Sequence, residues 1–376
     1  MKRFNIKPRY EYKNKIENLG FNFHDDYWKE DAYYSFSIDE ISAIEAASNE
    51  CYNMYCDTVQ YIINNNLFDK LLIPQSMHQA IIDSWNKDDL SLYGRFDFSI
   101  KDGEIKLLEF NADTPTSLLE SAIIQWKWKE DVFPDNDQFN SIHENLVQSW
   151  IGIEKHYHFN EYHFAACREN VEDEETLQYI VATAMEAGLN TTEIDMEHLR
   201  LTDDEKFLVN PSDEIVKACF KLYPWEWMFD ESPEGCKANI QWFEPLWKSL
   251  MSNKAILPIL YELFPESPYL LPCYLDEPHG MKSYCKKPIY GREGSNITLI
   301  KNENTLIESG GDYNDNGYVY QKLSELPEFK DKETNESKYP VVGSWIIGGE
   351  CCGIGIRETN NLITDNVSNF VPHIIN

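Results

Sequence analysis

The chain is short of positive charge. Against 64 Asp and Glu residues it has 33 Lys and Arg residues, which gives a formal net charge of -31 over 376 residues. We therefore expect no nucleic-acid partner, because binding a phosphate backbone needs a cationic surface. Long apolar runs are also lacking, since no segment approaches the roughly 20 apolar residues that span a bilayer. The sequence accordingly predicts no membrane partner.

The cysteines lack a framework spacing. Nine cysteines are scattered along the chain, Cys351 and Cys352 are adjacent, and none stands in a CxxC arrangement. An odd number of scattered thiols in a long chain is typical of a reducing compartment and argues against a thiolate zinc site. The basic N-terminus has no apolar run after it, as a secretory signal would. We therefore expect a cytoplasmic protein.

The chain is rich in residues that form a hydrophobic core. Its residues are 42% hydrophobic and 14% aromatic, which excludes a disordered chain. The length suggests about two to three domains. Residues 1 to about 90 are predicted to be mostly helical, with a long helix at 37–66 for which Ser37 and Asp39 are the possible caps. Residues 162–194 predict a β-α-β unit that opens a small α/β domain.

The third section begins near residue 243. Residues 246–263 are predicted to be helical around Lys254, and strands are predicted at 283–288, 297–300 and 318–323. A hydrophilic insertion follows at 327–338, and residues 339–358 predict a closing hairpin.

The stretch 92–116, LYGRFDFSIKDGEIKLLEFNADTPT, predicts two strands joined by a tight turn. Arg95 and Asp97 share one face of the first strand, and Glu109 and Asn111 share one face of the second. If the two faces meet, two carboxylates, an amide and a guanidinium converge. Hard oxygen ligands beside a guanidinium suit a magnesium-bound polyphosphate.

The turn decides whether those faces meet. A two-residue loop, Asp102-Gly103, would point the two polar sets apart. A three-residue loop that includes Lys101 would place Arg95 opposite Glu109. We predict the three-residue loop. The residues alone leave a second interpretation open, in which the hairpin is a surface turn with a cross-strand salt bridge.

A second candidate is the loop 291–296, GREGSN, which lies between two predicted strands. It fits neither the Walker pattern nor the dinucleotide fingerprint, although its backbone N–H groups could cover phosphates beside Lys287. An ordinary glycine hairpin is the alternative. Lys254 alone is typical of a solvated surface residue, whereas Arg357 in an apolar strand indicates function. The histidines show no spacing of a metal site.

These pieces occur together in a recognisable order, and together they resemble the synthetase part of the glutathionylspermidine synthase family. The resemblance covers essentially the entire chain and rests on five motifs: RFD at 95–97, LEFNADTPT at 108–116, YPWE at 223–226, KP with GREGSN between 287 and 296, and GIRE at 355–358. The length suggests the stand-alone type, without the amidase domain of bifunctional members.

The resemblance implies an ATP-grasp fold of the α+β or α/β class, with an inserted pre-ATP-grasp-like α/β domain and a helical N-terminal region. Residues 1–160 would hold the helical region and the metal-binding hairpin. Residues 161–245 would form the α/β domain, and residues 246–376 the remainder of the ATP-grasp unit.

The resemblance also implies roles for individual residues. Asp97, Glu109 and Asn111 match magnesium ligands, and Arg95 matches the arginine that stabilises the transition state. The implied ATP contacts are Arg95, Lys254, Lys287, Gly291, Gly294, Ser295, Asn296, Tyr320, Gln321, Lys322 and Leu323. The implied substrate contacts are Thr114, Thr116, Glu172, Asp173, Glu226 and Arg357. Thr114 and Thr116 stand where the family has serines, and the acidic pair could equally be Glu174 and Glu175.

The implied function is an ATP- and Mg²⁺-dependent ligase that joins a small carboxylate to a small amine through an acyl phosphate. In the family these are glutathione and spermidine. A nucleotide-binding regulatory protein of the same fold is the main alternative. A carbohydrate-processing enzyme with paired carboxylates is disfavoured by the accompanying lysine and loop. The sequence does not indicate an oligomeric state.

Overall fold

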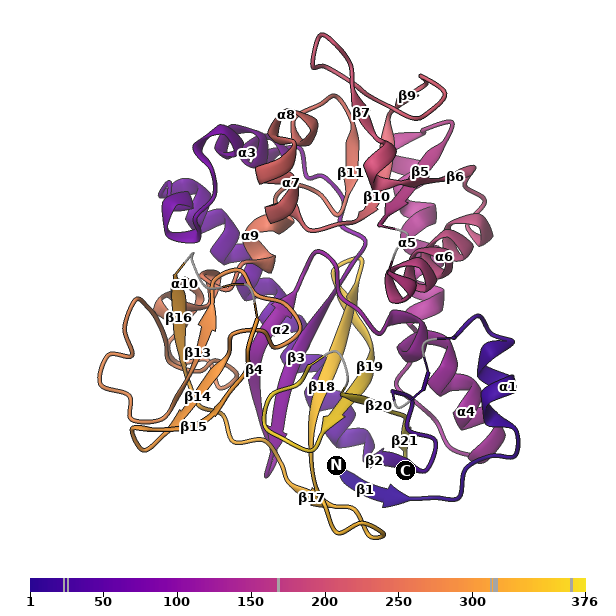
Figure 1. The fold of residues 1–376 in the computed structure, drawn as a ribbon, viewed down its shortest axis with the longest axis vertical. Coiled ribbons are helices and arrows are strands. Elements are labelled where there is room, and N and C mark those ends of the chain that lie inside the picture. Colours follow the sequence, from indigo (N-terminus) through magenta and orange to yellow (C-terminus); the bar gives the residue numbers. More distant parts are fainter. Residues whose placement is uncertain (23, 26, 168–169, 312, 314–316, 366–367) are drawn as a thin grey trace.

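The computed structural model describes residues 1–22, 24, 25, 27–167, 170–311, 313, 317–365 and 368–376. The residues described form five sheets with covering helices, in a mixed α/β arrangement (Figure 1). Within these residues, no helix combines the length and apolar character needed to cross a membrane.

A central sheet carries the predicted hairpin. Its strand order is β20-β19-β18-β3-β4, with β17 paired to β18 (Figure 1). The strands are β3 (Tyr93–Lys101), β4 (Glu104–Asn111), β17 (Phe329–Lys330), β18 (Ser337–Ile347), β19 (Glu350–Thr359) and β20 (Asn369–Val371). β18 and β19 form the closing hairpin that the sequence predicts.

Helices cover both faces of the central sheet. Val342 and Ile346 of β18 pack into the same core as α2 (Ile38–Asn64), while Trp345 and Ile347 pack into the core of α5 (Ile142–Tyr157). Successive strand side chains point to opposite faces, so both faces of the sheet must be apolar.

The long helix α2 begins as its sequence predicts. Ser37 is its N-cap and shares a capping box with Glu40, which satisfies backbone N–H groups at the helix start. The apolar periodicity of this helix predicts a core face at Ile41, Ile44, Ala47, Tyr52, Met54 and Val59. All of these are buried except Tyr52, which is half-buried.

The predicted β-α-β unit is present and lies in the upper part of Figure 1. A parallel sheet has the order β11-β10-β5-β6. Its elements are β5 (Tyr162–Ala166), α6 (Val171–Glu186), β6 (Thr191–Asp195), β10 (Ala218–Leu222) and β11 (Gln241–Phe243). A small antiparallel sheet of β7 (Arg200–Leu201), β8 (Leu208–Val209) and β9 (Ile215–Val216) accompanies it.

A five-stranded antiparallel sheet lies on the left of Figure 1, in the order β12-β16-β13-β14-β15. The strands are β12 (Cys273–Leu275), β13 (Tyr284–Pro288), β14 (Thr298–Lys301), β15 (Asn304–Glu308) and β16 (Tyr318–Lys322). The glycine-bearing loop 291–296 connects β13 to β14, so it lies between two strands as predicted.

Three predictions of local structure were wrong. The N-terminal region is not simply helical, because β1 (Lys2–Asn5) and β2 (Ala32–Phe36) form a sheet with β21 (His373–Ile375). The helix predicted at 246–263 is two helices, α9 (Lys248–Ser252) and α10 (Ile256–Leu263), and Lys254 lies between them. Pro224 and the charged run at 230–235 indicate a loop, but this segment holds α7 (Trp225–Glu231) and α8 (Pro233–Cys236).

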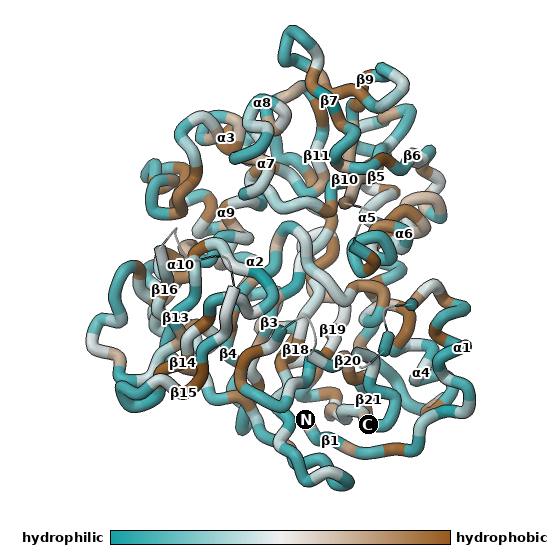
Figure 2. Tube along the Cα trace, viewed as in Figure 1, coloured by the Kyte–Doolittle hydropathy of each residue, from teal (hydrophilic) through white to brown (hydrophobic). Residues whose placement is uncertain are grey.

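The remaining helical elements are short. They are α1 (Tyr12–Glu17), the 3₁₀ turns Phe68–Leu71, Gln75–Met77 and Met196–His198, α3 (His78–Asn86), a π turn (Glu120–Ile124) and α4 (Gln125–Val132). Hydrophilic residues follow the outer loops (Figure 2).

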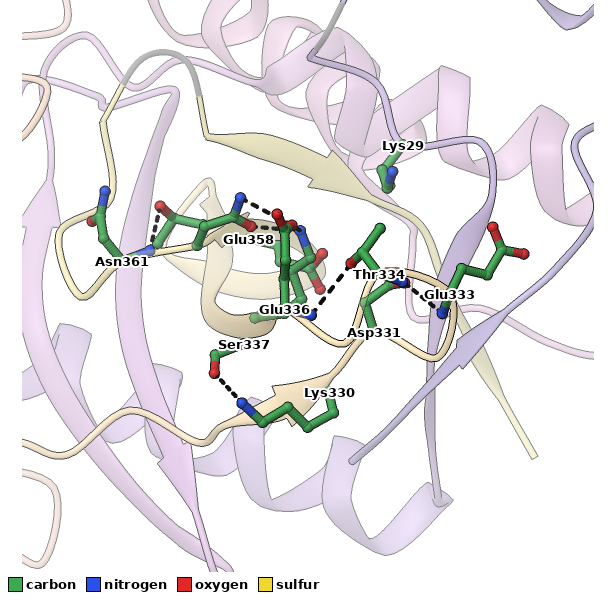
Figure 3. A network of polar contacts seen from close by, with 12 residues as sticks. Lys29, Lys330, Asp331, Glu333, Thr334, Glu336, Ser337, Glu358 and Asn361 are labelled. Atoms are coloured by element: carbon green, nitrogen blue, oxygen red, sulfur yellow. Dashed lines mark hydrogen bonds and ion pairs between the residues drawn. The ribbon is translucent and has the colours of Figure 1, made fainter.

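A buried charge network fastens the N-terminal strand to the central sheet. Arg3 of β1 donates to both carboxylate oxygens of Glu358 in β19, at 2.7 and 3.0 Å, and lies 3.0 Å from Asp331. Asp331 accepts the backbone N–H groups of Glu333 and Thr334, both at 3.0 Å (Figure 3). The network holds the end of β19 in place directly beside Arg357.

Candidate active site

The turn of the hairpin differs from its prediction. Lys101 pairs with Glu104, so the loop is the two-residue Asp102-Gly103. Both loop residues have positive φ, 53° and 85°, as a type I′ hairpin turn requires. The predicted three-residue loop was therefore wrong. By itself this turn would point the two polar sets apart.

A β-bulge restores the convergence. Pairing passes from Phe98–Leu107 to Asp97–Glu109, so Leu108 is an extra residue and the register moves by one. Beyond the bulge Arg95 faces Asn111, whereas the sequence predicted Arg95 opposite Glu109. The predicted patch of Arg95, Asp97, Glu109 and Asn111 nevertheless shares one face, because one slip in register reverses the faces of every later residue.

Side chains from the five-stranded sheet hold the bulge. Lys287 of β13 donates from Nζ to the Leu108 carbonyl at 2.9 Å and to Gln321 Oε1 at 2.9 Å. Gln321 of β16 in turn donates from Nε2 to the Leu107 carbonyl at 3.1 Å. A bulged strand leaves backbone groups outside the regular ladder, and these two side chains satisfy the carbonyls there.

Asp97 lies at the centre of the patch. Arg95 donates to it from Nε at 2.8 Å and from Nη2 at 3.1 Å, and Asn111 donates from Nδ2 at 3.1 Å. Arg95 also reaches the Thr116 carbonyl at 2.5 Å. The guanidinium is thus fixed between the hairpin and the segment 112–116 that follows it.

Glu109 is paired with Lys254. Lys254 Nζ lies 3.4 Å from Glu109 Oε2 and donates to the Gly291 carbonyl at 2.6 Å. Burial opposes ionisation of Glu109, but Lys254 and Lys287 together lower its pKa below the ordinary value. The carboxylate therefore stays anionic at the foot of the glycine-bearing loop.

A cavity of about 880 Å³ opens between the central and five-stranded sheets. Of the residues predicted to contact ATP, eight line it: Lys254, Lys287, Gly291, Gly294, Ser295, Gln321, Lys322 and Leu323. Arg95, Tyr320 and Asn296 lie outside the lining. Tyr320 points the other way from β16 and contacts Tyr284, with ring centroids 5.7 Å apart. Asn296 supports its own loop by accepting the Tyr313 N–H at 2.8 Å.

A smaller cavity of about 130 Å³ adjoins the first. The predicted residues that line it include Arg95, Asn111, Thr114, Thr116, Glu172, Glu226 and Arg357. Asp97, Glu109 and Lys254 line both cavities. A group bound in one cavity would therefore meet a group bound in the other at these three side chains.

The smaller cavity has half-buried acids at its wall. Burial raises the pKa of Glu172 and of Glu226, and burial followed by the nearby Glu172 raises the pKa of Asp173 to about 6. Asp173 lies beside the cavity but outside its lining. The alternative acidic pair lies elsewhere: Glu174 accepts from Gln178 and Glu175 accepts from the Asn22 N–H.

Arg357 projects into the smaller cavity from β19. Its guanidinium donates to the carbonyls of Ser368 and Asp365, at 3.0 and 2.7 Å, and to Ser117 Oγ at 3.1 Å. It also lies over the Tyr27 ring, 4.8 Å from the centroid. Arg357 therefore stands in the wall of the smaller cavity, and its role as a substrate contact stays a prediction.

Two residues of the glycine-bearing loop were missed. Arg292 bonds to the Thr114 carbonyl and hydroxyl and lies 3.7 Å from Glu226, and Glu293 lines both cavities. Both stand within the GREGSN motif, so the signal was present. The sequence did not show that the loop's side chains reach across to the smaller cavity.

The fold is shared with a solved structure. The structure resembles that of a glutathione synthetase-like effector from Globodera pallida, with a TM-score of 0.57 and 10% identity, over 92% of this chain and 89% of the other. Residues 3–376 match the family described as glutathionylspermidine synthase preATP-grasp. The chain belongs to this family.

Three curated relatives are similar to the chain. A Haemophilus influenzae protein provisionally named an acid–amine ligase is 34% identical over 99% of both chains. Trypanothione synthetase of Crithidia fasciculata is 27% identical, over 86% of this chain and 54% of its own length. The bifunctional glutathionylspermidine synthetase/amidase of Escherichia coli K12 is 26% identical, over 96% of this chain and 62% of its own length.

Proposed function

We propose that the protein is an ATP- and Mg²⁺-dependent ligase that joins a small carboxylate to a small amine through an acyl phosphate. The observation that carries the proposal is the meeting of two cavities at Asp97, Glu109 and Lys254. The larger cavity has the lysines and glycine-bearing loop suited to a nucleoside triphosphate. The smaller one has the mixed charges suited to an acid and an amine.

The donor set at the meeting point fits magnesium. Asp97 and Glu109 supply two carboxylates, Asn111 supplies an amide oxygen, and hard oxygens are the ligands that Mg²⁺ takes in phosphate sites. No group of three or more His, Cys, Asp or Glu side chains in metal-binding proximity occurs among the described residues, so the amide is needed to complete a protein triad. Bound there, the ion would supply charge stabilisation to the phosphates.

The lysines and the loop position the nucleotide. Lys254 and Lys287 present ammonium groups at the wall of the larger cavity, and the backbone of the loop 291–296 can cover phosphates. Arg95 lies at the smaller cavity, where charge develops as the γ-phosphoryl group moves to the substrate carboxylate. A preorganised guanidinium there lowers the barrier without reorganising during the reaction.

The reaction proceeds in two balanced steps. A substrate carboxylate oxygen bonds to the γ-phosphorus as the bond to the β–γ bridging oxygen breaks, releasing ADP. The amine nitrogen then bonds to the carbonyl carbon, the carbon–oxygen bond to phosphate breaks, and the nitrogen loses a proton. The amide and inorganic phosphate are the products.

The substrates we propose are a thiol peptide of the glutathione type and a polyamine-like amine. Support comes from the names of the related enzymes and from the charges of the smaller cavity. Arg292 and Arg357 suit the carboxylates of a peptide, and Glu172 and Glu226 suit a cationic amine. We further propose that residues 161–245 are the inserted pre-ATP-grasp-like domain, between 1–160 and 246–376.

The test is ADP release with glutathione and spermidine, repeated with other peptide–amine pairs. Arg95→Ala and Asp97→Ala should each lower turnover by at least about 100-fold. Arg200→Ala is the control, because Arg200 is exposed and pairs with Asp213 at the surface. Unchanged turnover in both site variants would refute the mechanism. Magnesium-ATP binding without turnover on any amine would favour a regulatory protein of the same fold.

A further inference from the structure

A buried ion pair joins the hairpin to the α/β unit. Asp113 follows β4 and Lys221 belongs to β10, and Lys221 Nζ lies 2.7 Å from Asp113 Oδ1. Their side chains are 2% and 0% exposed. The two residues are 108 positions apart in the sequence, so only the tertiary fold brings them together.

Both charges have further partners. Lys221 also donates to the Tyr223 carbonyl at 2.8 Å and lies over the Trp225 ring, 4.1 Å from the centroid. The second oxygen of Asp113 accepts the Trp225 N–H at 2.9 Å. One ion pair thereby fixes the start of α7 against the segment that follows the hairpin.

Stability alone is a poor reason for such a pair. Removing two charges from water is costly, and well-packed apolar residues of similar volume often stabilise a fold as well or better. What an ion pair adds over apolar packing is a defined geometry, because its hydrogen bonds fix distances and directions.

The residues beside the pair line the smaller cavity. Thr114 follows Asp113, Glu226 follows Trp225, and both line that cavity. Arg292 contacts both of them from the glycine-bearing loop. The ion pair therefore joins the two segments that contribute Thr114 and Glu226 to the wall of this cavity.

We propose that Asp113 and Lys221 are positioning residues whose buried ion pair sets the place of Glu226 relative to Thr114, and with it the recognition of the acid and amine substrates. The inference rests on the proposed function. Lys221 does not line the smaller cavity, whereas Asp113 does. Because both carboxylate oxygens of Asp113 already accept hydrogen bonds from Lys221 and from the Trp225 N–H, the pair acts through its neighbours.

The test uses the double variant Asp113→Asn/Lys221→Met, which removes both charges together and leaves an oxygen for the Trp225 N–H. Magnesium-ATP affinity should stay within about twofold, while the KM values of acid and amine should rise at least about tenfold. The matched control is Arg200→Met/Asp213→Asn, which removes an exposed pair and should change neither. If the double variant does not fold, Asp113→Asn alone carries the comparison.

A double-mutant cycle separates positioning from a merely structural role. Glu226→Gln should raise the KM of the amine less in the double-variant background than in the wild type, since the carboxylate is already misplaced there. Full additivity, or wild-type KM values in the double variant, would overturn the inference.

Hydrogen exchange keeps the inference testable without turnover. The non-proline backbone amides of 112–116 and 225–228 should exchange faster in the double variant than in the control pair. If no acid–amine pair is turned over by the wild type, the ligase proposal fails, and unchanged exchange in these two segments would separately refute the positioning role.

Discussion

Replacing Lys287 by methionine tests whether the bulge and the nucleotide cavity share one support. Lys287 is 5% exposed. Its ammonium holds the Leu108 carbonyl and Gln321 Oε1, both at 2.9 Å. Methionine keeps most of the volume of the side chain but removes both hydrogen bonds. The bulge that aligns Glu109 with Asp97 would lose its contact with β13.

The expected change in the free energy of unfolding of Lys287→Met follows from two opposing contributions. Hydrogen bonds from a charged donor contribute about 1.5–3 kcal/mol each, and removing a buried ammonium returns part of that, since its desolvation is costly. We expect Lys287→Met to lower the free energy of unfolding by about 2–4 kcal/mol. Magnesium-ATP binding should weaken by at least about tenfold, or about 1.4 kcal/mol, since a cation leaves the cavity wall.

Urea denaturation and calorimetric titration with magnesium-ATP measure the two effects. The neighbouring Lys286 supplies a matched control. It lies on the same strand but outside the cavity lining, with its ammonium over the Tyr318 ring, 3.8 Å from the centroid. Lys286→Met should cost about 1 kcal/mol or less, the usual range of an exposed cation–π contact, and should leave ATP binding unchanged.

The reasoning would be refuted by a Lys287→Met protein with wild-type stability and wild-type ATP affinity. Equal effects of Lys286→Met and Lys287→Met would also contradict it, because the argument depends on which face of β13 each side chain occupies. A change in the urea slope would indicate an altered denatured or native state in place of a simple loss of contacts.

Three further predictions follow from packing and charge. Gly343→Ala should lower turnover at least about tenfold with ATP binding retained, because its Cβ would lie 2.8 Å from Arg95 Cδ. Burial raises the pKa of Glu120 to about 7, so the wild type loses stability as the pH rises from about 5 to about 8. Glu120→Gln lacks this loss. In urea denaturation its stability relative to the wild type should therefore rise over the same pH range, by at most about 3 kcal/mol. Arg3→Met should lower the free energy of unfolding by about 3–5 kcal/mol, since Glu358 stays buried without its cation.

Each of these predictions has a contradicting result. Gly152→Ala is the control for the glycine substitution, because its Cβ would meet nothing within 4 Å. Equal turnover in Gly152→Ala and Gly343→Ala would contradict the role given to the contact between residue 343 and Arg95. A pH-independent difference between Glu120→Gln and wild type would show that Glu120 is ionised throughout. Wild-type stability in Arg3→Met would mean that Glu358 finds another partner.

Acid should weaken the same N-terminal network. Burial opposes ionisation of Asp331, yet backbone N–H groups, Asn5 and Arg3 lower its pKa. Its stabilising contribution is present above the ordinary Asp pKa of about 4 and is lost as pH falls toward the folded value. Asp331→Asn should flatten the acid limb of a stability curve measured from pH 7 to pH 3, and an unchanged limb would contradict this.

Much of the local structure could be predicted because its causes are local. The α2 helix begins at Ser37 since its cap and the acid three residues later are adjacent in sequence. The β5-α6-β6 unit follows from apolar runs and turn residues. Lys254 was misplaced within a continuous helix, because nothing in its neighbourhood shows that the chain breaks at 253–255 to bring it to Glu109.

The sequence by itself determined which polar groups belong to the hairpin, since alternation along a strand is a property of neighbouring residues. It also determined which residues can form the turn, because Asp102 and Gly103 both accept positive φ. The loop that we predicted was nevertheless one residue too long. Only the tertiary structure decided the register that makes the site. The bulge at Leu108 is held by Lys287, which lies 179 residues further along the chain, and by Gln321 beyond it. Because that support is non-local, no pattern within the hairpin could show that Asp97 and Glu109 face one another.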